Sequence, residues 1–248
     1  MKQVVAINGS PRKANTTLLL NRIGGVLAKH GIKTTVLSLS DYRIMECIGC
    51  ETCVRKTGKC FQDDATEAVL SQIRNADGII LSSPVYLMQI TSSMKRMIDK
   101  TPSWTHRPPL VGKPVLLAST TAGSGLKDVL SYLETVSIQW GAFPTGFVGR
   151  SASNQSPVTE EDLKKFIWHM TNPKEKWVPS FKQLTQYQVQ RALATSVLDI
   201  DKQFWAKKGW DKQNYYFNCR IGPVKSIWSS VFYPFIKSRV KPDPRMTR

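Results

Sequence analysis

Residues 2–17, KQVVAINGSPRKANTT, decide the fold: an apolar run ends in a turn of small polar residues, and a helical pattern follows. The apolar run predicts a buried strand over Lys2–Ile7. Apolar residues then recur at helical spacing and predict a helix over Thr16–His30, closed by Gly31. Its apolar positions are Leu19, Ile23, Val26 and Leu27. A strand that turns directly into a helix is the first unit of an α/β sheet.

The same alternation continues to about residue 150. Further strands are expected at 34–39, 78–82, 114–119 and 143–148, and further helices at 66–75, 92–100 and 126–139. Strands that alternate with helices form parallel sheets through right-handed crossovers. The sequence therefore predicts an α/β fold with a doubly wound, five-stranded parallel sheet.

The sequence changes character beyond Arg150. Residues 151–248 predict a mostly helical, Trp-rich extension, so the expected domains are 1–150 and 151–248. Thr159 is the expected N-cap of its first helix, with Asp162 in the acidic first turn. Five of the seven tryptophans lie in the extension: Trp168, Trp177, Trp205, Trp210 and Trp228.

Charge is concentrated at the C-terminal end. The net charge is +17, and residues 202–248 hold 11 basic and 2 acidic residues. Such a patch attracts nucleic acid, anionic lipid or an acidic protein, and a solvated basic tail is the plain alternative. Nucleic-acid recognition motifs are absent, so no nucleic acid is expected. No apolar run approaches the roughly 18 to 20 residues of a spanning helix and no signal peptide is recognisable, so a cytoplasmic protein is expected.

The turns after strands one, three and four should form the ligand site, because doubly wound sheets bind ligands beyond the carboxyl ends of their strands. The first turn lacks the dinucleotide and nucleotide-triphosphatase glycine patterns. Its polar groups and the helix N-terminus suit a terminal phosphate, although a plain capped turn remains an alternative. The expected phosphate-binding residues are Ser10, Arg12, Asn15, Thr16 and Thr17.

The other two turns, SPVYLMQ and STTAGSG, combine a stiff, flat segment with small side chains and glycines. Together they could hold the face and edge of a planar ring, and ordinary packing of Tyr86 is the alternative. The expected ring-binding residues are Pro84, Val85, Tyr86 and Leu87 after strand three, and Thr120, Thr121, Ala122 and Gly123 after strand four.

Four of the five cysteines lie in CIGCETCVRKTGKC, residues 47–60. The spacing of Cys47, Cys50, Cys53 and Cys60 is close to the compact runs that ligate [4Fe–4S] clusters. Zinc is the main rival, and unliganded thiols the next. Gly49 and Gly58 provide the backbone freedom that a loop around a cluster needs. The basic residues of the loop, Arg55, Lys56 and Lys59, could offset the cluster's negative charge.

The segments GSPRKANT, SPVY and STTAGSG resemble those of the NADPH-dependent FMN reductase group of flavodoxin-like proteins. The cysteine spacing resembles the iron–sulfur flavoprotein branch of that group. The resemblance covers about residues 1–150. It implies a flavodoxin-like fold, FMN and a [4Fe–4S] cluster as cofactors, and a homodimer in which the cluster of one subunit lies near the flavin of another. The phosphate turn is one residue shorter than the commoner form of the family, and nothing carries over to the extension.

The leading functional hypothesis is an FMN-dependent oxidoreductase that joins a two-electron donor to one-electron carriers, with NAD(P)H or an acidic protein such as ferredoxin as the redox partner. The first alternative is an NAD(P)H-dependent flavin or quinone reductase whose cysteines bind zinc or nothing. The second is a binding or regulatory protein that uses the basic tail. No catalytic acid or base is expected. The remaining residues of interest, Cys219, His30, His106 and His169, are expected to be structural or at the surface.

The last segment with a helical pattern is GPVKSIWSSVFYPFIKSRVKP, residues 222–242. Its apolar residues predict one face of a helix that begins at Pro223 and is kinked or ended by Pro234 near Tyr233. Packing in a dimer is favoured as the cover of this face, over the chain's own domain and over lipid. The face consists of Val224, Ile227, Trp228, Val231, Phe232, Phe235 and Ile236, with Lys225, Ser226, Ser229, Ser230 and Lys237 opposite.

Overall fold

A five-stranded parallel sheet forms the centre of the computed structural model, which describes residues 1–240. The strand order is β2-β1-β3-β4-β5, which is the flavodoxin-like order. All pairs of neighbouring strands are parallel. The strands are β1 (Lys2–Asn8), β2 (Ile32–Ser38), β3 (Gly78–Pro84), β4 (Pro114–Thr121) and β5 (Phe143–Ser151). The predicted fold class and all five predicted strands are confirmed.

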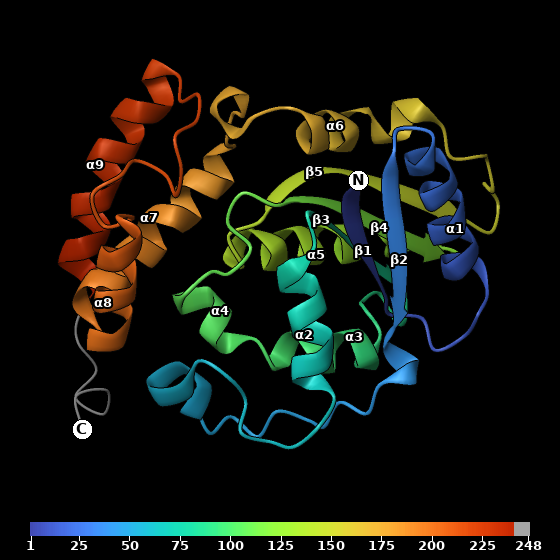
Figure 1. Cartoon of the computed structure of the whole chain (residues 1–248), viewed down its shortest axis with the longest axis horizontal. Helices are drawn as coiled ribbons and strands as arrows, with labels where there is room; N and C mark the ends of the chain where they lie inside the picture. The colour runs from blue at the N-terminus through green and yellow to red at the C-terminus, as the bar shows by residue number, and fades with distance from the viewer. Residues whose placement is uncertain (241–248) are drawn as a thin grey trace.

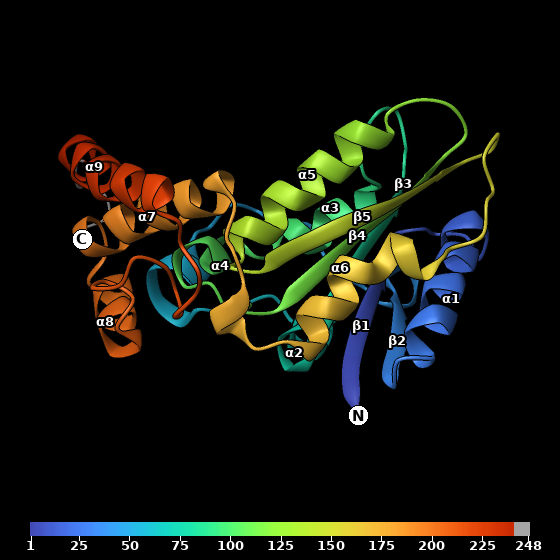
Figure 2. The same ribbon diagram turned by 90° about the horizontal axis from the view of Figure 1, so that it is seen from above.

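Helices cover both faces of the sheet (Figure 2). On one face lie α1 (Asn15–Ala28) and α6 (Glu160–Thr171), and on the other α2 (Thr66–Asn75), α3 (Ser92–Asp99) and α5 (Leu126–Gln139). Successive residues of a strand point to opposite faces, so Ile79 and Leu81 pack under the second layer and Ile80 under the first. Both faces are therefore apolar, as the nearly unbroken apolar strands predicted.

The helix α6 lies beyond the predicted boundary at residue 150, yet it packs on β4 and β5. Phe166 and Met170 fill the space above Gly78, where a side chain on the strand would collide with both. Thr159 and Asp162 form the reciprocal hydrogen bonds of a capping box at its start, so the predicted N-cap is confirmed.

The rest of the extension forms a separate helical layer at one end of the sheet (Figure 1). It contains η3 (Lys174–Lys176), α7 (Phe181–Ser196), α8 (Asp199–Lys208) and α9 (Pro223–Arg239). Its aromatic core includes Tyr187, Trp205 and Trp210. The Gln190 side chain of α7 donates to the backbone oxygens of Thr105 and Gln139, 2.6 and 2.8 Å away, and so joins this layer to the first domain.

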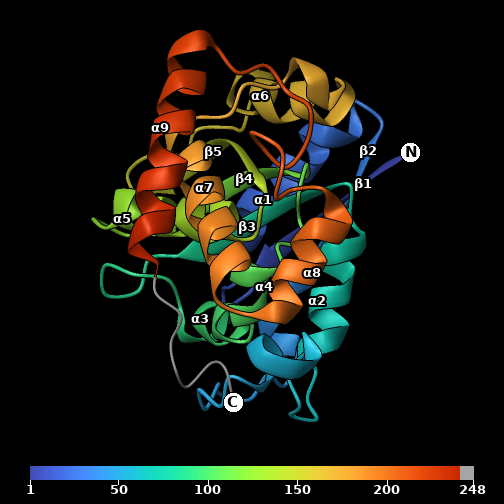
Figure 3. The same cartoon turned by 90° about the vertical axis from the view of Figure 1, so that its left-hand side faces the viewer.

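The structure corrects two expectations for α9. The helix continues through Pro234 to Arg239, so of the two predicted effects, a kink or an end near Tyr233, the end is wrong. One missing hydrogen bond does not end a helix that packs along α7 (Figure 3). Ser229, expected on the solvent side, is buried and accepts a hydrogen bond of 2.5 Å from Gln188. The final residues of the predicted segment, Lys241 and Pro242, lie outside the described residues, as does the rest of the basic tail.

The apolar face of α9 is divided. Trp228 and Phe232 stack with their ring centroids 4.5 Å apart, and Trp228 packs against the aromatic core of the extension and against Phe181 of α7. The side chains of Val224, Ile227, Val231 and Phe235 are 71, 66, 65 and 53% exposed. We call these four residues the α9 stripe.

Candidate functional site

A cavity of about 150 Å³ lies at the carboxyl edge of the sheet, where the turns after β1, β3 and β4 meet. Ten of the thirteen predicted flavin-site residues line it. These are Ser10, Arg12, Asn15, Thr16, Pro84, Val85, Tyr86, Thr120, Thr121 and Ala122. Three segments that are distant in sequence therefore form one pocket, as expected from the position of their strands.

The turn after β1 is held in a fixed shape. The Asn8 side chain accepts a hydrogen bond from the Ser10 backbone N–H at 3.0 Å, and Ser10 Oγ accepts one from Arg12 N–H at 3.2 Å. Gly9 passes so close to β3 that an added Cβ would lie 3.0 Å from the Ser82 carbonyl oxygen. No side chain caps the start of α1 at Ala14, and this first turn of the helix lines the cavity through Ala14, Asn15 and Thr16. This arrangement suits an anionic group such as a phosphate.

A direct contact links the first and third turns. Thr16 Oγ1 and Thr120 Oγ1 lie 2.8 Å apart and share a hydrogen bond. The second turn is a short hairpin closed by Tyr86 and Gln89, whose backbones pair at 2.8 and 3.0 Å. Its tip holds Leu87 and Met88 at φ values of 42° and 68°, in the left-handed region that few non-glycine residues adopt.

Three predicted residues do not line this cavity. Thr17 Oγ1 accepts a hydrogen bond of 3.1 Å from Asn8, and Leu87 and Gly123 are exposed beside the pocket. Ala14 and Ala152 line it and were missed. The sequence carried a signal for Ala152, because it follows β5 and the carboxyl end of that strand reaches the same edge.

The four clustered cysteines meet at a second, smaller pocket. Cys47, Cys50, Cys53 and Cys60 all line a cavity of about 60 Å³. The loop bends through left-handed residues at Gly49, Glu51 and Gly58, with φ values of 66°, 57° and 74°, so both glycines adopt the backbone conformations that favour glycine. A short π-helical turn, η2 (Cys53–Thr57), follows the third cysteine.

The environments of the four thiols differ. Hydrogen bonds from Thr52 lower the pKa of Cys50, whereas burial raises the pKa of Cys53. Within residues 1–240, no group of three or more His, Cys, Asp and Glu side chains stands in an arrangement that could hold one metal ion. Four thiols at one pocket are nevertheless a suitable donor set for an iron–sulfur cluster, which uses one cysteine on each of four irons.

The cysteine loop is also bonded to the extension, which the sequence did not predict. Arg107, from the segment after α4 (Pro102–His106), donates hydrogen bonds of 2.9 and 2.8 Å to the backbone oxygens of Cys53 and Val54. It also donates to Asp201 of α8, which contacts His106 Nδ1 at 2.7 Å. Leu198 packs against Cys53 and Val54 in the same place.

The helix α3 connects the two pockets. Thr91, its N-cap, donates a hydrogen bond of 2.7 Å to the Gly9 carbonyl oxygen in the first turn. Asp99 and Lys100, at its other end, line the cysteine pocket. Eight helical residues span about 12 Å, so α3 runs this distance from the turn after β1 to the cysteine pocket.

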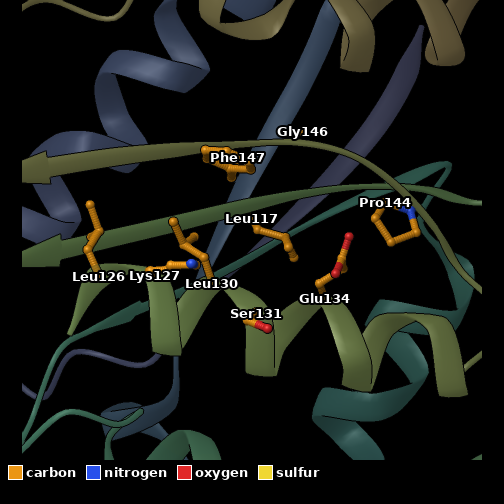
Figure 4. Close-up of a pocket in the computed structure, with 9 residues that line it drawn as sticks. All are labelled: Leu117, Leu126, Lys127, Leu130, Ser131, Glu134, Pro144, Gly146 and Phe147. Carbon is orange, nitrogen blue, oxygen red and sulfur yellow. The ribbon is translucent and has the colours of Figure 1, made fainter. Parts of the chain in front are cut away.

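A third cavity, of about 550 Å³, is larger than both pockets and contains none of the predicted residues (Figure 4). It lies between α5 and the edge strand β5 and is mainly apolar, with Leu130, Phe147 and Leu126 among its lining residues. It holds no cluster of groups suited to redox or metal chemistry, so the two smaller pockets are the candidate site.

The isolated residues have structural roles or lie at the surface. His169 packs between Phe143 and Trp177, with ring centroids about 5 Å away, and His106 contacts Asp201. His30 is at the surface beside Glu160. Cys219 is half-buried, and burial raises its pKa to about 11.

Known proteins resemble this chain over the same regions. The family model for NADPH-dependent FMN reductase matches residues 2–155, which include both pockets. The chain belongs to the NADPH-dependent FMN reductase family. An iron-sulfur flavoprotein of Archaeoglobus fulgidus is 32% identical over 222 residues, which cover 84% of this chain and 99% of that protein.

Other members extend the comparison. An iron-sulfur flavoprotein of Methanocaldococcus jannaschii is 40% identical over 100 residues, 40% of this chain and 51% of that protein. The RosB structure with bound 8-demethyl-8-formylriboflavin-5'-phosphate has a TM-score of 0.53 at 17% identity and covers 90% of this chain and 92% of that chain. It supports the fold alone. The family member described here is an FMN-dependent oxidoreductase of the iron–sulfur flavoprotein branch.

Proposed function

We propose that this oxidoreductase carries FMN in the cavity at the carboxyl edge of the sheet and a [4Fe–4S] cluster on Cys47, Cys50, Cys53 and Cys60. The observation that carries the proposal is the position of all four cysteines around one pocket, joined to the flavin pocket by α3. Bound FMN would exchange two electrons as a hydride, and the cluster would carry electrons singly. The protein would then join a two-electron donor such as NAD(P)H to one-electron carriers.

The residues of each pocket have separate tasks in this proposal. Ser10, Arg12 and the first N–H groups of α1 would bind the phosphate of FMN, as a helix N-terminus favours an anion. Pro84 to Tyr86 and Thr120 to Ala122 would hold its ring. The four thiols would bind iron as thiolates, which accords with a reducing, cytoplasmic location.

An acidic one-electron carrier such as a ferredoxin fits the surface around the cysteine loop. Lys56 and Lys59 of the loop are exposed, and α8 beside it adds Lys202, Lys207 and Lys208. Attraction between opposite charges accelerates such encounters. We also propose a homodimer in which the α9 stripe contacts a second copy, because four exposed apolar residues on one helix face resemble an interface core.

Anaerobic purification tests the cofactor proposal. The expected protein shows a flavin spectrum with a broad cluster absorption, and about four irons and four sulfides per chain, as a cubane requires. One zinc per chain without sulfide would contradict the proposed cluster. The second candidate function, a flavin or quinone reductase without a cluster, would then be favoured. A quinone reductase of Escherichia coli is 29% identical over 101 residues, 36% of this chain and 52% of that protein.

A further inference from the structure

A buried lysine lines the cysteine pocket. Lys100 follows α3, and its side chain has 0% exposure. Its Nζ lies 3.5 Å from Cys60 Sγ, within the range of a hydrogen bond to sulfur, and it also donates to the side-chain oxygen of Gln62. The ammonium group therefore contacts one of the four candidate iron ligands directly.

Asp64 holds this lysine in place. Its carboxylate is 1% exposed and lies 3.1 Å from Lys100 Nζ. The same carboxylate accepts hydrogen bonds of 2.8 Å from the backbone N–H groups of Met45 and Thr66. Burial opposes the ionisation of Asp64, but hydrogen bonds from Thr66, Met45 and Lys100 outweigh it and lower its pKa. Asp64 thus holds the lysine ammonium group beside the sulfur of Cys60.

Such a pair is costly in a protein interior. Two buried charges lose hydration free energy, and their mutual attraction compensates for this loss only in part. A protein with apolar residues of similar size in their place is often equally stable. The other cations of the loop, such as Lys56 and Lys59, are exposed, where water and salt screen them. A buried cation on a ligand sulfur is screened much less by water and salt, so it interacts more strongly with the charge of a cluster than these exposed cations do.

We propose that Lys100 sets the reduction potential of the cluster by donating a hydrogen bond to the thiolate of Cys60, and that Asp64 is the positioning residue for Lys100. The inference rests on the proposed function. A cluster gains one negative charge when it takes up an electron, and a hydrogen bond with a positive charge at its sulfur ligand stabilises that charge. Lys100 therefore raises the potential.

The test uses the full chain with its cluster reconstituted, and measures the midpoint potentials of cluster and flavin by titration followed by EPR and visible spectra. In Lys100→Met, the ratio of oxidised to reduced cluster at a fixed potential should rise at least tenfold, which is about 59 mV for a one-electron couple. The flavin potential of the same molecule should not change. Lys95→Met is the matched control, because Lys95 lies on α3 but is 48% exposed and pairs with Asp99.

Two further variants separate the role of Lys100 from general stability. The single change leaves Asp64 buried without its cation, whereas Lys100→Met with Asp64→Asn removes both charges and should fold normally. The double variant should still show the lowered cluster potential, because the hydrogen bond to Cys60 is lost. Lys100→Arg keeps a cation there, so its cluster potential should be close to that of the wild type.

The outcomes are distinct. A wild-type chain that takes up no iron and sulfide contradicts the proposed function and the inference together. A wild-type chain with a cluster whose potential is unchanged in the double variant overturns the inference alone. A shift of the cluster potential of equal size in Lys95→Met would also overturn the inference, since any nearby cation would then set the potential without a hydrogen bond to Cys60.

Discussion

Asp201 on α8 pairs with Arg107, whose guanidinium also holds the backbone oxygens of Cys53 and Val54. Both side chains of the pair are nearly inaccessible to solvent. The extension is therefore bonded to the cysteine loop through one buried arginine, and is part of the scaffold that shapes this loop.

Asp201→Asn should loosen the loop. The change leaves Arg107 buried without its counter-charge, which costs about 3 to 5 kcal/mol when a buried pair loses one partner. We expect a lower free energy of unfolding and faster hydrogen exchange at residues 47–60 in the chain without metal.

The control for this prediction is Lys182→Gln. Lys182 and Glu134 also join the extension to the first domain, 2.6 Å apart, but both are more than 40% exposed. Breaking an exposed pair should cost no more than about 1 kcal/mol. Equal losses in the two variants, with unchanged exchange in the loop, would contradict a special role for Asp201.

Ser10→Ala combined with Arg12→Ala should weaken FMN binding. Each lost hydrogen bond to a charged phosphate costs about 1.5 to 3 kcal/mol, so the dissociation constant should rise at least tenfold for each bond. Flavin fluorescence titration measures it. Lys13→Ala is the control, because Lys13 is exposed and absent from the lining of the cavity. An unchanged FMN affinity with an intact thermal transition would move the phosphate site elsewhere.

Deletion of residues 222–248 should convert a dimer to a monomer, or give insoluble protein because the surface of α7 that α9 covers becomes exposed. Val231→Glu is the finer test, since a carboxylate in the α9 stripe should separate the subunits without disturbing the contact of α9 with α7. Light scattering gives the mass. Ser230→Glu, an exposed position beside the stripe, should leave the mass unchanged. A Val231→Glu protein that remains a dimer would rule out this interface.

His169 should make stability depend on pH. Burial lowers its pKa below the ordinary 6.5, so in the pH range just below 6.5 the unfolded chain binds more protons at this residue than the folded chain does. Its contribution to the free energy of unfolding is therefore complete above pH 6.5 and declines as the pH falls, by up to about 1.4 kcal/mol per unit. In urea unfolding, the free energy of unfolding should decline less with falling pH in His169→Gln than in His30→Gln. The second variant is the control, because it alters a surface residue. Equal declines would refute this role.

The sequence alone determined the fold and most of the cavity at the carboxyl edge of the sheet. Apolar runs that alternate with helical spacing define parallel strands, and the carboxyl ends of these strands must share one edge. The turns that hold Ser10, Pro84 and Thr120 were therefore expected to meet, and they line one cavity. The cysteine spacing likewise indicated a common pocket, because all four residues lie within one short loop.

Only the tertiary structure decided which distant residues support that loop. Lys100 and Asp64 belong to different segments, and Arg107 and Asp201 are 94 positions apart, so no local pattern joins them. The course of α9 was also decided by packing. Contact with α7 carries the helix through Pro234 and buries Ser229, against the local preference of both residues. Side-chain periodicity specifies a face, but only the neighbouring surface determines which edge of that face is covered.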